Sequence, residues 1–151
     1  MNAAEIIATL GLKPLTIEGG HFFETYRSKF STAIYYLLQP ETFSAIHRLT
    51  TDEVFHFYCG DPVEMLQLLP DGTGRIVTIG ADLAAGQRPQ VVVPAGMWQG
   101  ARLAAGGKFA LLGTTVAPAF EYENYTHGDR AALVAAYPRW REAIEALTSA
   151  P

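Results

Sequence analysis

Two short stretches of the chain carry the residue types best suited to chemistry. The first runs from His47 to Glu53, and the second runs from Val91 to Gln99. An imidazole, a carboxylate and an amide oxygen can hold a small polar ligand, move a proton or coordinate a divalent metal. His47, Glu53 and Gln99 are therefore the central candidate residues of a functional site.

A strand, a turn and a returning strand would bring these groups together. Residues two apart on a strand share a face, so His47 and Leu49 point one way while Arg48 points the other. A three-residue turn follows Leu49, and Glu53 begins the returning strand. The turn Pro94–Gly96 precedes the strand that delivers Gln99 beside them.

The strand that begins at Glu53 divides its side chains between two faces. Glu53, Phe55 and Phe57 share one face, whereas His56 and Tyr58 share the other. The alternation favours a structural or interface role for His56, with a catalytic role for His56 and Tyr58 kept as an alternative. Aromatic side chains near the pocket are expected to form its wall and part of the core. The predicted ligand-binding residues are Phe55, Phe57, Trp98 and Gln99.

Helical patterns occur only at the two ends of the chain. Asn2 can cap a short helix with Glu5 three residues on, and Gly11 stops it. Asp129 can cap a run through Ala136, and a second helix is predicted over Trp140–Leu147.

Between the ends the pattern is that of β structure, with short runs separated by Gly, Pro and Asp turn signals. Turns such as Pro70–Gly74 and Ala105–Gly107 supply glycines for tight reversals. Many short strands in 151 residues predict a single all-β domain spanning 1–151, built as a sandwich or barrel with terminal helices. The predicted strands are His21–Arg27, Thr32–Leu38, Phe43–Leu49, Glu53–Cys59, Glu64–Leu69, Arg75–Ile79, Gln90–Val93, Trp98–Leu103, Phe109–Val116 and Phe120–Asn124.

The amino-acid composition narrows the classes of possible binding partners. The formal net charge of −4 comes without a cluster of Lys and Arg, so the electrostatic footprint of a nucleic-acid-binding protein is missing. Cys59 is the only cysteine, so no internal disulfide can form, and the start of the chain has no basic segment ahead of an apolar run. We expect a cytoplasmic protein without a membrane partner.

The two stretches resemble the paired motifs of the cupin superfamily. Its first motif reads His-x-His, three or four residues, Glu, six residues, Gly, and its second reads Pro-x-Gly, two residues, His. His47, Glu53 and Gly60 match the first motif, and Pro94 and Gly96 match the second.

Two positions depart from the motifs, because Leu49 and Gln99 stand where ligand histidines are expected. The resemblance implies a cupin jelly-roll barrel with a metal site that lacks two imidazoles. A divalent metal held by His47, Glu53 and Gln99 would bind weakly, and the alternative is a hydrogen-bonded polar cluster without metal.

The wider sequence resembles a small single-domain cupin branch of uncharacterised function, whose members usually form dimers. A homodimer would also cover the edge strand His21–Arg27. We therefore expect a small-molecule-binding cupin. The alternative is an enzyme of the epimerase or isomerase type acting on a small polar or carbohydrate-like metabolite, since epimerase relatives use a His base and a Tyr acid without metal. The candidate catalytic residues are His47, Glu53, His56 and Tyr58.

Overall fold

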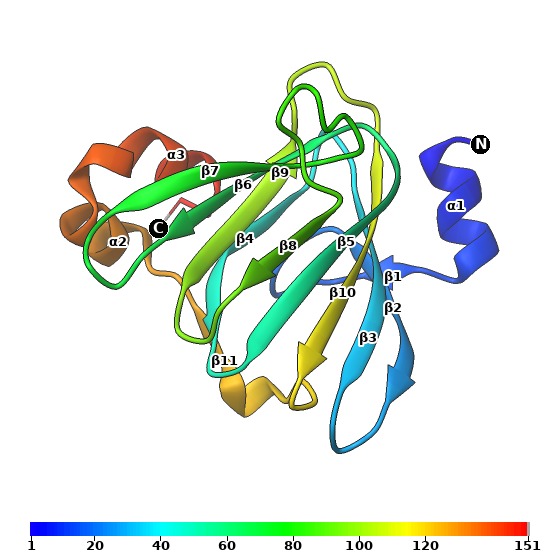
Figure 1. Cartoon of the computed structure of the whole chain (residues 1–151), viewed down its shortest axis with the longest axis horizontal. Coiled ribbons are helices and arrows are strands. Elements are labelled where there is room, and N and C mark those ends of the chain that lie inside the picture. The colour runs from blue at the N-terminus through cyan, green and yellow to red at the C-terminus, as the bar shows by residue number, and fades with distance from the viewer. Residues whose placement is uncertain (151) are drawn as a thin grey trace.

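Two antiparallel sheets face each other in the computed structural model, which describes residues 1–150 (Figure 1). The first sheet has the strand order β1-β2-β3-β10-β5-β8, and the second has the order β11-β4-β9-β6-β7. The all-β jelly-roll architecture predicted from the sequence is confirmed. The strands are β1 (Lys13–Pro14), β2 (His21–Arg27), β3 (Thr32–Leu38), β4 (Phe43–Leu49), β5 (Asp52–Gly60), β6 (Val63–Leu68), β7 (Gly74–Ile79), β8 (Gln90–Val93), β9 (Trp98–Leu103), β10 (Ala110–Ala117) and β11 (Tyr125–His127).

The main core lies between the sheets and follows the two-residue alternation of the strands. On β8, Val91 and Val93 are buried while Val92 is half exposed. Phe55 of β5 and Met65 of β6 meet the same core from opposite sheets. Burial of this apolar surface is the main force that holds the sheets face to face.

Helices cover the outer faces of both sheets on opposite flanks of the molecule (Figure 1). On one flank, α1 (Ala3–Leu10) packs Ile6 against Leu37 of β3. On the other flank, α2 (Arg130–Ala136) and α3 (Arg141–Ala146) form a second core with Ile46 of β4 and Leu66 of β6.

The predicted helix signals are confirmed at both ends. Asn2 and Glu5 form a reciprocal capping box, and Gly11 ends α1 in the left-handed region at φ 64°. The Asp129 side chain accepts a hydrogen bond from the backbone N–H of Ala132, which caps α2.

One predicted strand was wrong, and one short strand was not predicted. The segment predicted as the strand Phe120–Asn124 forms the 3-10 turn η1 (Tyr122–Asn124), and the strand β11 follows it. Tertiary contacts override the local pattern here, because Thr32 Oγ1 accepts from the Phe120 N–H and β11 pairs with β4. The last helix, α3 (Arg141–Ala146), follows the 3-10 turn η2 (Pro138–Trp140) and agrees with the predicted Trp140–Leu147 to within one residue at each end. The short strand β1 had no sequence signal.

Candidate functional site

A cavity of about 120 Å³ lies between the two sheets. Its lining residues come from strands β2, β3, β4, β5, β10 and β11, from the loop between β1 and β2, and from the segment around η1. Aliphatic and aromatic side chains make up much of the wall, and a few polar groups project into it. The polar lining residues are Glu18, Glu24, Arg27, Thr32, His47, Glu53, Thr114, Tyr122 and Tyr125.

His47 of β4 is the most deeply buried titratable residue of the cavity, at 2% exposed. Its Nδ1 lies 2.7 Å from the carbonyl oxygen of Ala45. A carbonyl only accepts, so Nδ1 carries the hydrogen and Nε2 bears a lone pair in the neutral ring. Nε2 lies 3.9 Å from Glu18 Oε1, too far for a hydrogen bond. His47 therefore offers a basic nitrogen to the cavity.

Glu53 of β5 reaches the cavity from the opposite sheet and is also buried. Gln99 Nε2 donates a 2.7 Å hydrogen bond to Glu53 Oε2. Burial raises the pKa of the Glu53 carboxyl, and the charge of Glu18 adds to the rise, while His47 and hydrogen bonds from Gln99 and Thr114 oppose it. Glu53 thus holds a proton more readily than an exposed glutamate does.

Glu18 enters the cavity from the loop between β1 and β2. Ser44 Oγ donates a 2.6 Å hydrogen bond to Glu18 Oε1. The two glycines that follow make this approach sterically feasible: a Cβ on Gly19 would lie 2.1 Å from the carbonyl oxygen of Phe43, and a Cβ on Gly20 would lie 2.9 Å from the Tyr36 hydroxyl. Both glycines also have positive φ, a conformation that other residues rarely adopt.

Tyr125 of β11 closes one wall of the cavity. Its ring stacks on the His47 imidazole, with 5.1 Å between centroids and an 18° angle between planes. Its hydroxyl lies 2.9 Å from Nδ1 of His127. Burial raises the pKa of Tyr125, and the charge of Glu18 contributes, so the phenol stays protonated at neutral pH.

An ion-pair cluster lies at the rim. Arg27 donates to both carboxylate oxygens of Glu24, at 2.8 and 2.9 Å. The same guanidinium donates to the carbonyl oxygen of Phe120 and to Glu121 Oε1, each at 3.0 Å. These bonds tie the end of β2 to the segment that leads into η1.

The structure places the predicted site residues in three groups. His47 and Glu53 line the cavity, and Gln99 lies directly behind Glu53. Phe55 and Phe57 are on the same face as Glu53 but pack into the main core.

The other three predicted residues do not reach the cavity. His56 and Tyr58 lie on the outer face of the first sheet, where His56 Nε2 is 3.2 Å from Thr115 Oγ1 and Tyr58 packs edge-on against Tyr35. Trp98 packs with the second core, and Arg48 lies over its ring at 4.5 Å.

The three predicted metal ligands do not converge as a coordination set. Gln99 turns its NH₂ group, which is a donor, toward Glu53. Within residues 1–150, no group of three or more His, Cys, Asp and Glu side chains is placed to hold a metal ion. The residues present thus do not fit the metal centre that the fold family implies.

Sequence reasoning did not select Glu18, Glu24, Arg27 and Tyr125 as site residues. Glu18 and Tyr125 reach His47 from segments 29 and 78 residues away in the sequence, so no local spacing links them to it. The one available signal was the Glu-Gly-Gly run at Glu18, because paired glycines mark a close approach of the backbone to other groups.

Comparison with known proteins identifies the family. The family model of DUF985, a family of the cupin superfamily, matches residues 4–128. The chain belongs to this cupin family. An uncharacterized protein of Saccharomyces cerevisiae is 27% identical in an alignment of length 134, and the match covers 72% of this chain and 67% of the yeast protein. No helix in residues 1–150 of this cupin is long and apolar enough to cross a membrane.

Solved structures agree with this assignment. A protein from Shewanella oneidensis is 33% identical, covers 100% of this chain and 99% of its own, and superposes with a TM-score of 0.94. A hypothetical protein from Leishmania major is 29% identical, covers 99% of this chain and 100% of its own, and gives a TM-score of 0.93. Bacillus subtilis oxalate decarboxylase is only 13% identical, covers 86% of this chain and 36% of its own, and gives a TM-score of 0.59, a likeness of fold alone.

Proposed function

We propose that this cupin binds a small polar molecule in the cavity between its sheets. The observation that carries the proposal is the pair His47 and Glu53, which project into one cavity from opposite sheets. Burying polar groups costs free energy unless they gain partners, so a protein keeps them inside where they serve a purpose. A bound ligand would supply the partner that His47 Nε2 lacks.

The size of the cavity limits the ligand. A volume of about 120 Å³ is comparable to the roughly 150 Å³ engineered cavity that accepts benzene. The enclosed part of the ligand is therefore about one six-membered ring or a short chain, and any larger portion would extend past the rim formed by Arg27 and Glu24.

Ligand-observed NMR with a panel of monosaccharides, polyols and amino alcohols tests the proposal. We expect binding to wild type that His47→Ala removes. His56→Ala is the matched control, because His56 lies on the outer face of the first sheet, and it should leave binding unchanged. Equal loss in both variants, or equal binding in all three proteins, would contradict the proposal.

A second candidate function is proton transfer on such a ligand, as in an epimerase or isomerase. The contrast between the two walls favours it: His47 presents a lone pair from β4, and the pKa of Glu53 on β5 is raised by burial, which suits a general acid. In D₂O, wild type should exchange a carbon-bound proton of the substrate for deuterium, and His47→Ala should not. Binding without exchange by wild type would leave the protein a binding module.

We propose that the protein acts as a cytoplasmic homodimer. The free, exposed thiol of Cys59 suits a reducing compartment. The exposed edge of β2 offers a surface for pairing across a two-fold axis.

A further inference from the structure

Two hydrogen-bond acceptors of the cavity have no donor in the described chain. Nε2 of the neutral His47 ring accepts, and so does Glu18 Oε2, which has no hydrogen-bond donor within residues 1–150. His47 is only 2% exposed, yet its Nε2 has no hydrogen-bond partner in the described chain. These two acceptor atoms therefore need a hydrogen-bond donor from water or from a ligand.

The one guanidinium of the cavity lining is already used within the protein. The Tyr125 hydroxyl also has a partner, because it lies 2.9 Å from Nδ1 of His127. The Arg27 guanidinium is held by Glu24, Glu121 and the Phe120 carbonyl. An anionic ligand, such as a carboxylate or phosphate, would therefore find the guanidinium of the lining already paired.

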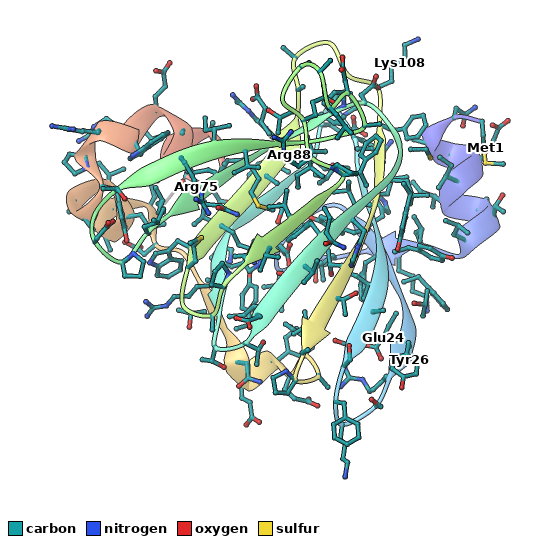
Figure 2. The ribbon with its side chains drawn as sticks, viewed as in Figure 1. Met1, Glu24, Tyr26, Arg75, Arg88 and Lys108 are labelled. Carbon is teal, nitrogen blue, oxygen red and sulfur yellow. The ribbon has the colours of Figure 1, made fainter. Side chains whose placement is uncertain are left out.

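The charge of the lining points in the same direction. The lining includes three carboxyls, those of Glu18, Glu24 and Glu53, and one guanidinium, that of Arg27, which is paired with Glu24 and Glu121. Glu18 is 17% exposed at its side chain, and no cation lies within hydrogen-bond distance of it in residues 1–150. Lysine and arginine residues such as Lys108 and Arg88 lie toward the opposite end of the molecule from Glu24 (Figure 2). Glu18 is thus a largely buried carboxylate with no Lys or Arg partner in residues 1–150, and the nearest nitrogen that can carry a charge is His47 Nε2 at 3.9 Å.

Aromatic side chains complete the wall. Phe22, Phe120, Tyr122 and Tyr125 line the cavity, and Phe120 and Tyr122 meet edge to face with centroids 5.3 Å apart. Aromatic faces attract cations by their quadrupole. An acidic, acceptor-rich cavity with aromatic walls is suited to an organic cation.

We infer that the cavity selects a ligand with a primary ammonium group, which binds between Glu18 and His47 Nε2 with its carbon skeleton against the aromatic wall. The inference rests on the proposed binding function and names the chemical class of the ligand. An ammonium group supplies three donors and one positive charge, which match the open acceptors and the Glu18 carboxylate.

Three probes of one shape test the inference: cyclohexylammonium, cyclohexanol and cyclohexanecarboxylate. Each has a six-membered ring that suits a cavity of about 120 Å³. Their affinities are measured by NMR titration at neutral pH against wild type, Glu18→Gln and the surface control Glu41→Gln. Since a hydrogen bond to a charged group contributes about 1.5–3 kcal/mol, we expect cyclohexylammonium to bind wild type about tenfold or more tightly than cyclohexanol, with the carboxylate weakest.

Glu18→Gln should abolish this preference while Glu41→Gln preserves it. Thermal unfolding confirms that both variants fold. If cyclohexanol binds in a His47-dependent way and cyclohexylammonium binds no better, the ligand class is wrong and the cavity still binds small molecules. A preference for the carboxylate, or an ammonium preference that survives Glu18→Gln, also overturns the inference. Binding of no probe to wild type at millimolar concentration overturns the inference and counts against the proposed function as well.

Discussion

Gln99 on β9 and Glu53 on β5 join the two sheets through a buried hydrogen bond of 2.7 Å. The bond crosses an interior that is otherwise held mainly by apolar contacts. It gives a carboxylate a donor in a place where an unpartnered carboxylate would cost several kcal/mol or take up a proton. The amide at position 99 thus has a clear role in this protein without a metal ion.

Gln99→Leu should destabilise the fold because it leaves Glu53 Oε2 without its donor. A buried acceptor left unsatisfied costs about 1–3 kcal/mol. Urea unfolding should therefore show a loss of that size, and Gln90→Leu, at an exposed position of β8, should show almost none. Equal stabilities of wild type and Gln99→Leu at pH 7 would contradict the role given to this bond.

The titration of Glu53 should appear in the pH dependence of stability. Burial raises the pKa of Glu53 in the folded protein above its ordinary value of 4.5. The stability that its proton contributes is fully present below the unfolded pKa and is lost as the pH rises through the folded pKa. Glu53→Gln keeps an acceptor for Gln99 and cannot ionise, so its melting temperature relative to wild type should rise with increasing pH.

Melting curves between pH 4 and pH 8 measure this difference. Glu41→Gln, at an exposed position, gives the control for loss of one surface charge. A difference between Glu53→Gln and wild type that stays constant over this pH range would show that Glu53 ionises in the folded protein as it does in the unfolded chain.

Local sequence patterns predicted most of the fold but few of the residues that line the cavity. The alternation on Gln90–Val93 and the cap at Asn2 act through neighbours in sequence, so both were predictable. The same alternation predicted that His47 and Glu53 face the interior and that His56 lies on the outer face of its sheet. Trp98 was expected near the pocket because it adjoins Gln99, yet strand parity sends it to the opposite face, against the C-terminal helices.

The remainder of the site depends on contacts between distant segments. Glu18 reaches the cavity because two glycines let its loop approach β4, and Tyr125 reaches it because β11 pairs with β4. The paired glycines after Glu18 indicate a close backbone approach but not its partner, and the prediction for the segment before Tyr125 was the wrong kind of element. To predict that Glu18 and Tyr125 line the cavity, one would therefore need to know how segments far apart in the chain pair and pack.

Removal of divalent metal should leave the protein's stability almost unchanged. His47, Glu53 and Gln99 do not present three converging donors, and loss of two imidazoles from the usual cupin set leaves few strong ligands. Thermal unfolding with and without EDTA, together with elemental analysis of untreated protein, measures this. A drop of several degrees with EDTA in wild type that disappears in His47→Ala would instead establish a structural metal at this position.

The protein should form a homodimer through the free edge of β2. Strand β1 pairs only with His21 and Phe22, so the rest of β2 has no partner on that side in the described chain. Two aromatic residues on this stretch, Phe23 and Tyr26, are 44% and 56% exposed, and Figure 2 shows Tyr26 at the outside of the sheet. An exposed edge with apolar side chains favours pairing with a second strand.

Light scattering at micromolar concentration should therefore give twice the 16.4 kDa chain mass. Phe23→Lys places a charge at the proposed contact and should shift the protein to monomer, because edge lysines oppose strand pairing. Leu83→Lys changes an apolar loop residue that is 62% exposed and should remain dimeric, and circular dichroism confirms that both variants fold. A wild-type mass of 16.4 kDa would exclude the dimer, and a Phe23→Lys variant that stays dimeric would move the contact away from β2.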